Sequence, residues 1–135
     1  MSENEKISGL RVVVYGDPAV KTVSVKNGNN AGQQKKVLEI RAYHPNAERN
    51  QDGTYTKKDS DWYTLKLWDE KADDIQKMLK DGMALRICGS LTHRTFKDKN
   101  GVDKAAKDIN LYSLAVDLKQ PGLHIDFSKP AKKEE

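Results

Sequence analysis

The sequence predicts a mainly β fold, a five-stranded Greek-key barrel with one α-helix between the third and fourth strands. Two observations predict it. Five segments alternate apolar and polar residues or are rich in β-branched residues, and Gly, Pro and Asn turns separate them. One further segment has the apolar spacing of a helix. With 135 residues, the chain has room for one domain with a single core.

The first two strands are expected before residue 44. Residues 10–15, LRVVVY, form the first strand and stop at the turn at residues 16–18, and residues 22–26 either continue it or pair with it. Residues 36–43 alternate as the second strand. We expect Leu38, Ile40 and Ala42 to face inward and Val37, Glu39, Arg41 and Tyr43 to face outward. The polar residues 44–60 are expected to form a long mobile loop or an extended hairpin.

The third strand, residues 61–68, has an unusual outer face. Its sequence, DWYTLKLW, places Tyr63, Leu65 and Leu67 on the inner face and Trp62, Thr64, Lys66 and Trp68 on the outer one. A polar face with both tryptophans of the chain and a lysine between them is not a core-facing pattern. Flat aromatic rings that alternate with a cation on an open sheet face are what unpaired nucleic-acid bases stack on.

A helix is expected at residues 69–82. Asp69 is the predicted N-cap, and Gly82 follows the predicted end. The predicted apolar stripe consists of Ala72, Ile75, Met78 and Leu79.

Two more strands follow the helix. Residues 83–97 form the fourth, with a bulge expected at Gly89, and after a turn at residues 98–101 the last strand covers residues 108–118. This order of elements is typical of the oligonucleotide/oligosaccharide-binding (OB) fold. The predicted organisation is a flexible N-terminus (1–8), the OB-fold domain (9–120) and a short polar C-terminal tail (121–135).

The charge pattern favours a polyanionic partner. The net charge is +4, but residues 69–81 alone contribute −2, so the rest of the chain carries +6. Cys88 is the one cysteine, which excludes an intramolecular disulfide and suits a reducing cytosol. The chain has neither an apolar signal segment nor an apolar run long enough to span a membrane. We therefore expect a cytoplasmic, nucleoid-associated protein without a membrane partner.

No pattern in the sequence supports an enzyme, a metal site or a cofactor. The three histidines, His44, His93 and His124, do not have metal-ligand spacing. Nucleophile elbows, phosphate loops and dinucleotide fingerprints are absent from the sequence. Residues 98–101 resemble a calcium loop only faintly and are expected to form a hairpin turn.

The candidate binding residues are aromatic and basic side chains of the outer face. Phe96 shares a face with Arg94, and Tyr43 shares one with Arg41. The predicted stacking residues are Trp62, Trp68, Phe96 and Tyr43, and the predicted phosphate contacts are Lys66, Arg41, Arg94 and Arg86. Tyr55, Lys57 and Lys58 are expected to add contacts from the long polar segment. An outward aromatic that stands alone more often packs against a loop or another subunit.

Residues 62–116 resemble the bacterial single-stranded DNA-binding protein (SSB) family. The resemblance rests on DWYTLKLWDEKADDIQKMLKDGMALRICGSLTHRTFKDKNG, which has a Trp strand, a helix ending in Leu-Lys-x-Gly, and Thr-x-Arg-aromatic-x-Asp-x-x-Gly; residues 9–43 match weakly. It implies an OB fold and sequence-independent binding and protection of single-stranded DNA in replication, recombination or repair. It also implies base stacking at Trp62, Trp68 and Phe96 and a homo-oligomer, a tetramer or a dimer.

One feature departs from that family. This chain stops 17 residues after Leu118 and ends in Lys-Lys-Glu-Glu, without the long Gly/Pro/Gln-rich linker and acidic Pro-Phe tip that recruit replication and repair enzymes. Recruitment of such partners through the tail is therefore not expected, and a plasmid, phage or mobile-element variant fits as well as a housekeeping protein. Two alternatives stay open: an OB-fold module whose aromatics form a protein interface, and a primosome accessory factor.

Overall fold

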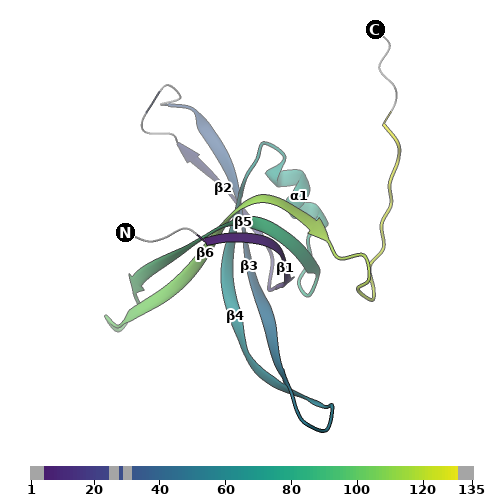
Figure 1. Ribbon diagram of the computed structural model, residues 1–135. Helices are drawn as coiled ribbons and strands as arrows, with labels where there is room; N and C mark the ends of the chain where they lie inside the picture. The colour runs from purple at the N-terminus through teal and green to yellow at the C-terminus, as the bar shows by residue number, and fades with distance from the viewer. Residues whose placement is uncertain (1–4, 25–27, 29–31, 131–135) are drawn as a thin grey trace.

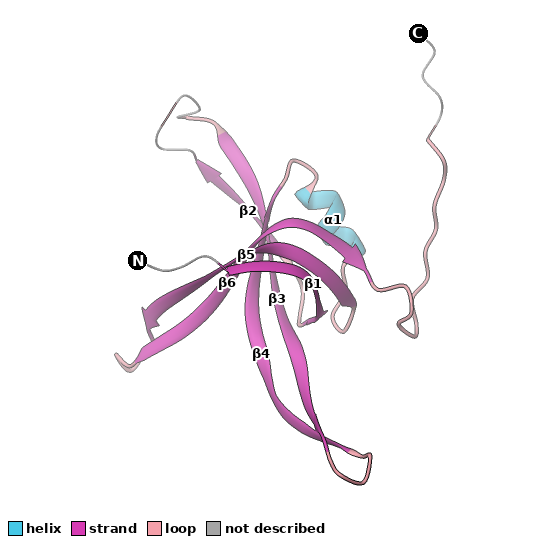
Figure 2. Ribbon diagram, viewed as in Figure 1, coloured by secondary structure: helices cyan, strands magenta, loops and turns pink. Residues whose placement is uncertain are grey.

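A computed structural model describes residues 5–24, 28 and 32–130 of the chain (Figure 1). It confirms a mainly β fold with one short helix (Figure 2). The elements are β1 (Glu5–Val14), β2 (Ala19–Ser24), β3 (Gln34–Arg49), β4 (Tyr55–Trp68), α1 (Ala72–Met78), β5 (Ala84–Lys97) and β6 (Asp103–Val116).

The strands form one sheet that closes on itself. Their order is β1-β5-β6-β4-β3-β2, and β1 also pairs with β3 through Val13↔Tyr43 and Val14↔Ala42. The strands β1, β5, β6, β4 and β3 therefore form a ring, and they are the five predicted strands with the helix between the third and fourth. Among the described strands, β4 and β6 pair in parallel and the other pairings are antiparallel.

β2 corrects one expectation. Residues 22–26 were expected to continue or pair with the first strand, but Ala19–Ser24 form a separate strand that pairs with β3 from Ala19↔Glu39 to Ser24↔Gln34. Residues 25 and 26 of the predicted segment lie outside the described residues.

The core lies inside the ring, where the inward faces of the strands meet. Its fully buried side chains include Leu38, Ile40, Leu65, Leu85, Ile87 and Ile109. The inward faces predicted for β3 and β4 are confirmed. Val37 was expected outward but is only 2% exposed. It lies directly between Lys21 and Trp68 in the strand register, and these longer side chains flank it on the same face.

One boundary in the N-terminal half differs from expectation, and the structure decides between the two expectations for residues 44–60. β1 begins at Glu5, so residues 5–8 belong to the sheet rather than to a flexible lead, and residues 1–4 lie outside the described part. Residues 44–60 are an extended hairpin of β3 and β4, which projects from the body (Figure 1), and not a mobile loop. Its turn is held by the hydrogen bond that Asn50 N donates to Thr54 O over 2.8 Å.

The helix is shorter than predicted. It spans Ala72–Met78 with Lys71 as its N-cap, and Asp69 accepts the Lys71 N–H over 2.8 Å without capping the helix itself. Ala72 and Leu79 are buried, but Met78 is exposed and does not belong to the apolar stripe. Met78 is the last residue of the helix, and its side chain is exposed to solvent.

Gly89 produces the predicted bulge. The register of β5 and β6 shifts between Cys88 and Gly89, and a Cβ at Gly89 would lie 2.3 Å from the carbonyl oxygen of Asn110. The turn at residues 98–101 is also confirmed, because the Asp98 carboxylate accepts the N–H groups of Asn100 and Val102.

The chain after β6 is fixed to the start of β5 by the side chain of Gln120. β6 spans Asp103–Val116, so it starts and ends earlier than the predicted 108–118. The Gln120 side chain accepts the N–H of Ala84 and donates to its carbonyl oxygen, each over 2.8 Å. Residues 121–130 contain no helix or strand, and residues 131–135 lie outside the described part. No helix of the described residues is long and apolar enough to cross a membrane.

Candidate nucleic-acid interface

A groove on the outer face contains two of the predicted stacking residues. It is lined by side chains of β3, β4, β5 and β6, among them Arg41, Trp62, Arg94, Phe96 and Lys107. Strand alternation aims Arg41, Trp62, Arg94 and Phe96 outward, because residues an odd number of positions away on the same strands, such as Ala42, Tyr63 and Leu91, face the core. Lys107 instead shares the face of Ile109, and its Nζ lies 5.3 Å from the ring centroid of Tyr63. The pairing of β4 with β6, and of β6 with β5, then brings the strands of the two aromatic rings to one surface.

Trp62 lies in an aromatic and cationic cluster. Its ring centroid is 5.0 Å from that of Tyr43 and 5.3 Å from that of Tyr15, which meets it edge-on. The Cζ atom of Arg41 lies 5.1 Å from the ring centroid of Trp62. The indole is still 38% exposed. It is therefore held firmly by its neighbours and remains open on the solvent side.

Phe96 repeats the arrangement on β5. The Cζ atom of Arg94 lies 5.4 Å from its ring centroid, and the ring is 42% exposed. The two aromatic rings of the groove thus each have a guanidinium group beside them. This pairing strengthens stacking, because a cation on one face of a ring polarises it.

A buried acid lies between the two basic residues at the centre of this surface. Asp108 is 6% exposed, and its carboxylate is 2.9 Å from Nε of Arg94 and 3.8 Å from Nζ of Lys66. The hydrogen bond and the charge of Asp108 raise the pKa of Arg94 above its usual value. Lys66 and Arg94, two of the four predicted phosphate contacts, are therefore both ion-paired.

The sequence of this protein matches one known family. The sequence model of the single-strand binding protein family matches residues 33–116, which include β3, β4, α1, β5 and β6. The chain belongs to the single-strand binding protein family. No curated protein matches the sequence.

The fold is also that of solved single-stranded DNA-binding proteins. The small single-stranded DNA-binding protein of Streptomyces coelicolor is 17% identical, with a TM-score of 0.63 over 87% of this chain and 95% of the other. The SSB of Plasmodium falciparum, solved in complex with ssDNA, is 21% identical, with a TM-score of 0.53 over 86% and 98%. SSBb of Mycobacterium smegmatis is 11% identical, with a TM-score of 0.51 over 94% and 100%. At these identities the likeness establishes the fold alone.

Three residues in or beside the groove were not expected from the sequence. Tyr15 contacts Trp62, Asp108 pairs with two of the cations, and Lys107 lines the groove and is 3.4 Å from the Asp61 carboxylate. A hydrogen bond from Asn46 and the charge of Lys107 lower the pKa of Asp61. The alternation of β1 contains a signal for Tyr15, because Val12 and Val14 are buried and the next residue must face outward.

Trp68 lies apart from the groove. It lines a different hollow with Lys35 and Lys36, and it is 48% exposed. It lies six positions along β4 from Trp62, which is about 20 Å at the usual rise of a strand. The sequence predicted one stacking face, and in the structure its two tryptophans line separate hollows.

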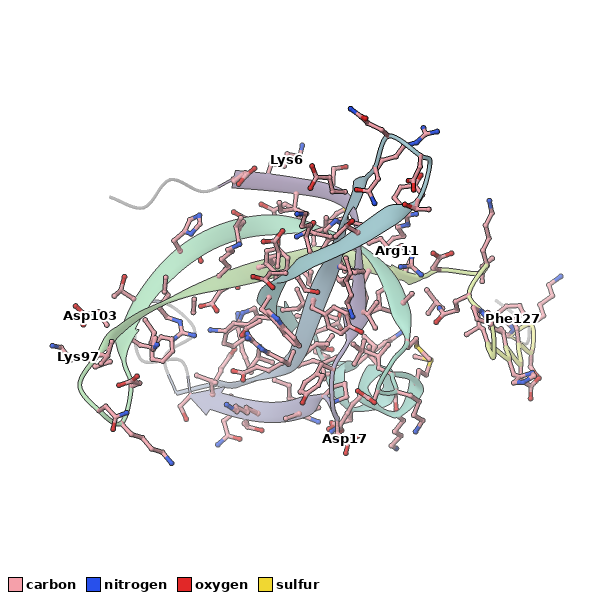
Figure 3. The ribbon with its side chains drawn as sticks, turned by 90° about the horizontal axis from the view of Figure 1, so that it is seen from below. Lys6, Arg11, Asp17, Lys97, Asp103 and Phe127 are labelled. Atoms are coloured by element: carbon pink, nitrogen blue, oxygen red, sulfur yellow. The ribbon has the colours of Figure 1, made fainter. Side chains whose placement is uncertain are left out.

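Arg86 lies at the opposite end of β5 from Phe96. It donates to the carbonyl oxygen of Gly9 over 3.3 Å and is in register with Arg11 of β1. Figure 3 shows Arg11 and Lys97, the neighbour of Phe96, on opposite sides of the molecule. The structure therefore does not bring Arg86 to the groove.

The three predicted binding residues of the β3–β4 hairpin lie at two places, two of them beside Trp62 and one near the hairpin tip. Lys57 and Lys58 line a hollow that includes Trp62, and Lys58 forms an ion pair with Glu48 over 2.9 Å. Tyr55 is in register with Arg49 near the tip and is 68% exposed. The two lysines thus extend the basic surface beyond Trp62, and Tyr55 does not contact it.

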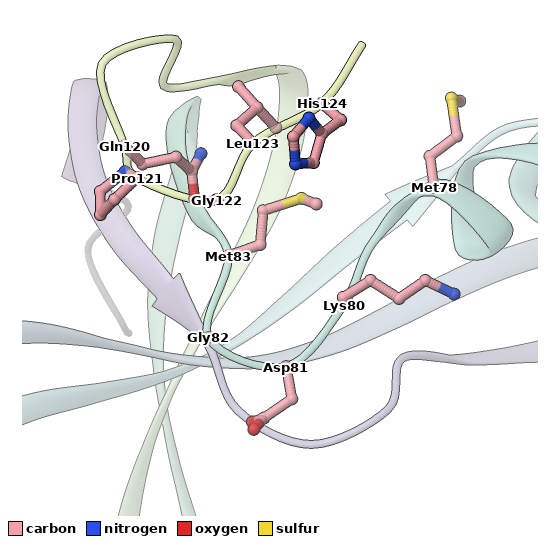
Figure 4. A pocket seen from close by; sticks show the side chains of 10 residues that line it. All are labelled: Met78, Lys80, Asp81, Gly82, Met83, Gln120, Pro121, Gly122, Leu123 and His124. Atoms are coloured by element: carbon pink, nitrogen blue, oxygen red, sulfur yellow. The ribbon is translucent and has the colours of Figure 1, made fainter. Parts of the chain in front are cut away.

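A further hollow is bounded by residues 78–83 on one side and 120–124 on the other (Figure 4). Its charged side chains, Lys80 and Asp81, point in different directions, and Asp81 accepts the N–H of Gly16 over 2.7 Å. None of the groove aromatics lines it. Within the described part of the chain, no cluster of His, Cys, Asp or Glu is suited to hold a metal ion.

Proposed function

We propose that this member of the single-strand binding protein family binds single-stranded DNA without sequence preference, in the groove between Trp62 and Phe96. The observation that carries the proposal is the pair of half-exposed rings, each with a guanidinium within 5.4 Å of its centroid. Base stacking on such rings depends little on which base is present, and nearby cations attract the phosphates. The family membership and the fold shared with solved ssDNA-binding proteins support the same function.

The residues of the groove have distinct proposed roles. Trp62 and Phe96 stack on bases, while Tyr43 and Tyr15 support the indole from the side. Arg41 and Arg94 of the groove, and Lys66 beside Asp108, neutralise phosphates. The hairpin residues Lys57 and Lys58 extend this contact. In this proposal Trp68 is a second stacking station further along the DNA, and Arg86 and Tyr55 make no contact with the groove-bound segment.

We further propose that the protein protects single-stranded DNA during replication, recombination or repair, and that residues 9–120 act as its DNA-binding domain. The proposal contains no catalytic step. As a family member the protein is proposed to act as a homo-oligomer, a tetramer or a dimer, associated with the nucleoid in the cytoplasm.

The test is the equilibrium binding of a fluorescently labelled dT oligomer, followed by anisotropy from about 0.05 to 1 M salt. We expect the logarithm of affinity to fall linearly with the logarithm of salt, with a slope of about −0.7 for each neutralised phosphate. A duplex of mixed sequence is the control, and it should bind far more weakly because its bases are already stacked. Equal affinity for duplex, or DNA binding that does not depend on salt, would instead favour an aromatic surface that binds a protein.

A further inference from the structure

A row of alternating charges crosses the outer face of the sheet. Lys21 of β2 is 3.0 Å from the carboxylate of Glu39 on β3, which is in register with Lys66 of β4. Lys66 is 3.8 Å from the Asp108 carboxylate on β6, and this carboxylate is 2.9 Å from Arg94 of β5. The row crosses β4 at Lys66, which lies between Trp62 and Trp68. DNA that reaches from one station to the other must therefore pass over it.

Asp108 is the most deeply buried member of the row. It is in register with Thr64 of β4 and Thr92 of β5, so its side chain lies on the outer face, yet that side chain is only 8% exposed. The longer side chains of Lys66 and Arg94 shield it from solvent, and each is far more exposed than Asp108. Among the described residues, Oδ1 of Asp108 has no hydrogen-bond partner. The carboxylate is therefore a charge beneath the DNA-facing surface, held in place by two cations.

This position has a consequence for DNA affinity. Lys66 and Arg94 would present two positive charges to phosphates, but their shared partner cancels one of them. Because water screens a half-buried ion pair only incompletely, the cancellation persists at moderate salt. A phosphate that binds here has to compete with Asp108 for the same donors.

We propose that Asp108 competes with the DNA phosphates for Lys66 and Arg94. It is a positioning residue that acts through these two cations. By this competition it keeps ssDNA binding weaker than it would be without the Asp108 charge. This inference rests on the proposed function. The same contact holds the guanidinium of Arg94 beside the ring of Phe96. Asp108 thus orders the stacking site and lowers its phosphate affinity, which favours release of the DNA.

The test compares Asp108→Asn with the unmodified chain in dT binding. Asparagine has nearly the same shape and keeps an oxygen that accepts the Arg94 N–H, so the variant removes the charge and replaces the other carboxylate oxygen with an NH2 group. We expect the slope of log affinity against log salt to steepen by about 0.7, which is the contribution of one additional neutralised phosphate. If the affinities of the variant and the wild type converge near 1 M salt, the variant should bind about fivefold more tightly at 0.1 M salt.

The matched control is Asp117→Asn. Asp117 also accepts from an arginine Nε, that of Arg11, over 3.0 Å, and the substitution changes the net charge equally. It follows the end of β6, nine residues from Asp108, or about 30 Å along an extended chain. The salt slope of this variant should equal that of the wild type.

A third comparison tests whether Asp108 acts through its two partners. In a Lys66→Gln, Arg94→Gln background, Asp108→Asn should no longer change the salt slope. If Asp108→Asn fails to fold, the single variants decide: Lys66→Gln and Arg94→Gln should each flatten the slope by less than Arg41→Gln does. Equal flattening by all three would overturn the proposal.

The outcomes separate this inference from the proposed function. A folded Asp108→Asn variant that binds dT with the wild-type slope and no gain in affinity overturns the role of Asp108 alone, because the wild type still binds. A wild-type protein that does not bind dT overturns both.

Discussion

Trp62→Ala is expected to weaken dT binding more than any other single substitution in the groove, by about 1–3 kcal/mol, or roughly 5- to 150-fold in Kd. The expectation follows from the surroundings of the ring. Tyr43 and Tyr15 hold it at centroid distances of 5.0 and 5.3 Å, so little conformational entropy is lost when a base stacks on it. Arg41 adds a cation 5.1 Å from the ring centroid, close to where a phosphate would approach. The measurement is anisotropy of labelled dT at fixed low salt.

Two variants make this result specific. Trp62→Phe keeps a flat ring and should retain most of the affinity. Tyr112→Ala removes an aromatic that is 69% exposed and does not line the groove, and it should leave Kd unchanged. Thermal unfolding of each variant checks that the fold is intact. Equal losses for Trp62→Ala and Tyr112→Ala would contradict the assignment of the groove.

Gly89→Ala is expected to give the largest loss of stability, about 3 kcal/mol or more in the free energy of unfolding. A Cβ at this position would lie 2.3 Å from the carbonyl oxygen of Asn110 and 2.9 Å from Cγ2 of Ile109. The first contact is with backbone of the paired strand, so it is relieved only by separating β5 from β6 at the bulge. Urea unfolding followed by far-UV circular dichroism measures the loss.

Gly53→Ala is the matched control for this stability prediction. Gly53 has a φ of +87° and open space around it, so alanine there pays only the strain of a left-handed backbone, about 1–2 kcal/mol. If Gly89→Ala costs no more than Gly53→Ala, close strand approach is not what requires glycine at the bulge.

The sequence predicted which side chains face inward and which face outward on most strands, because strand alternation is a local property. A period of two placed Leu38, Ile40 and Leu65 in the core and Trp62 and Phe96 at the surface, and the structure agrees. The bulge at Gly89 was predicted from the same kind of local signal. The sequence did not decide whether residues 44–60 form a hairpin or a loop, because polar segments of this length have similar compositions in both.

The parts that the sequence did not predict depend on register between distant strands. Asp108 meets Arg94 and Lys66 only because β6 pairs with both β5 and β4, and the sequence does not encode that register in any local pattern. Tyr15 reaches Trp62 through the pairing of β1 with β3 in the same way. Trp68 was grouped with Trp62 because both face outward, although length along the strand separates them.

The most direct test of the stacking account uses a protein in which Trp62 is the remaining tryptophan. The chain has two tryptophans, so Trp68→Phe isolates the emission of Trp62 and keeps an aromatic ring at position 68. Titration with a dT oligomer at low salt should quench this emission, saturate at the same concentration as the anisotropy signal, and reverse when salt is raised. Binding that saturates by anisotropy while the Trp62 emission stays constant would contradict stacking of bases on this ring.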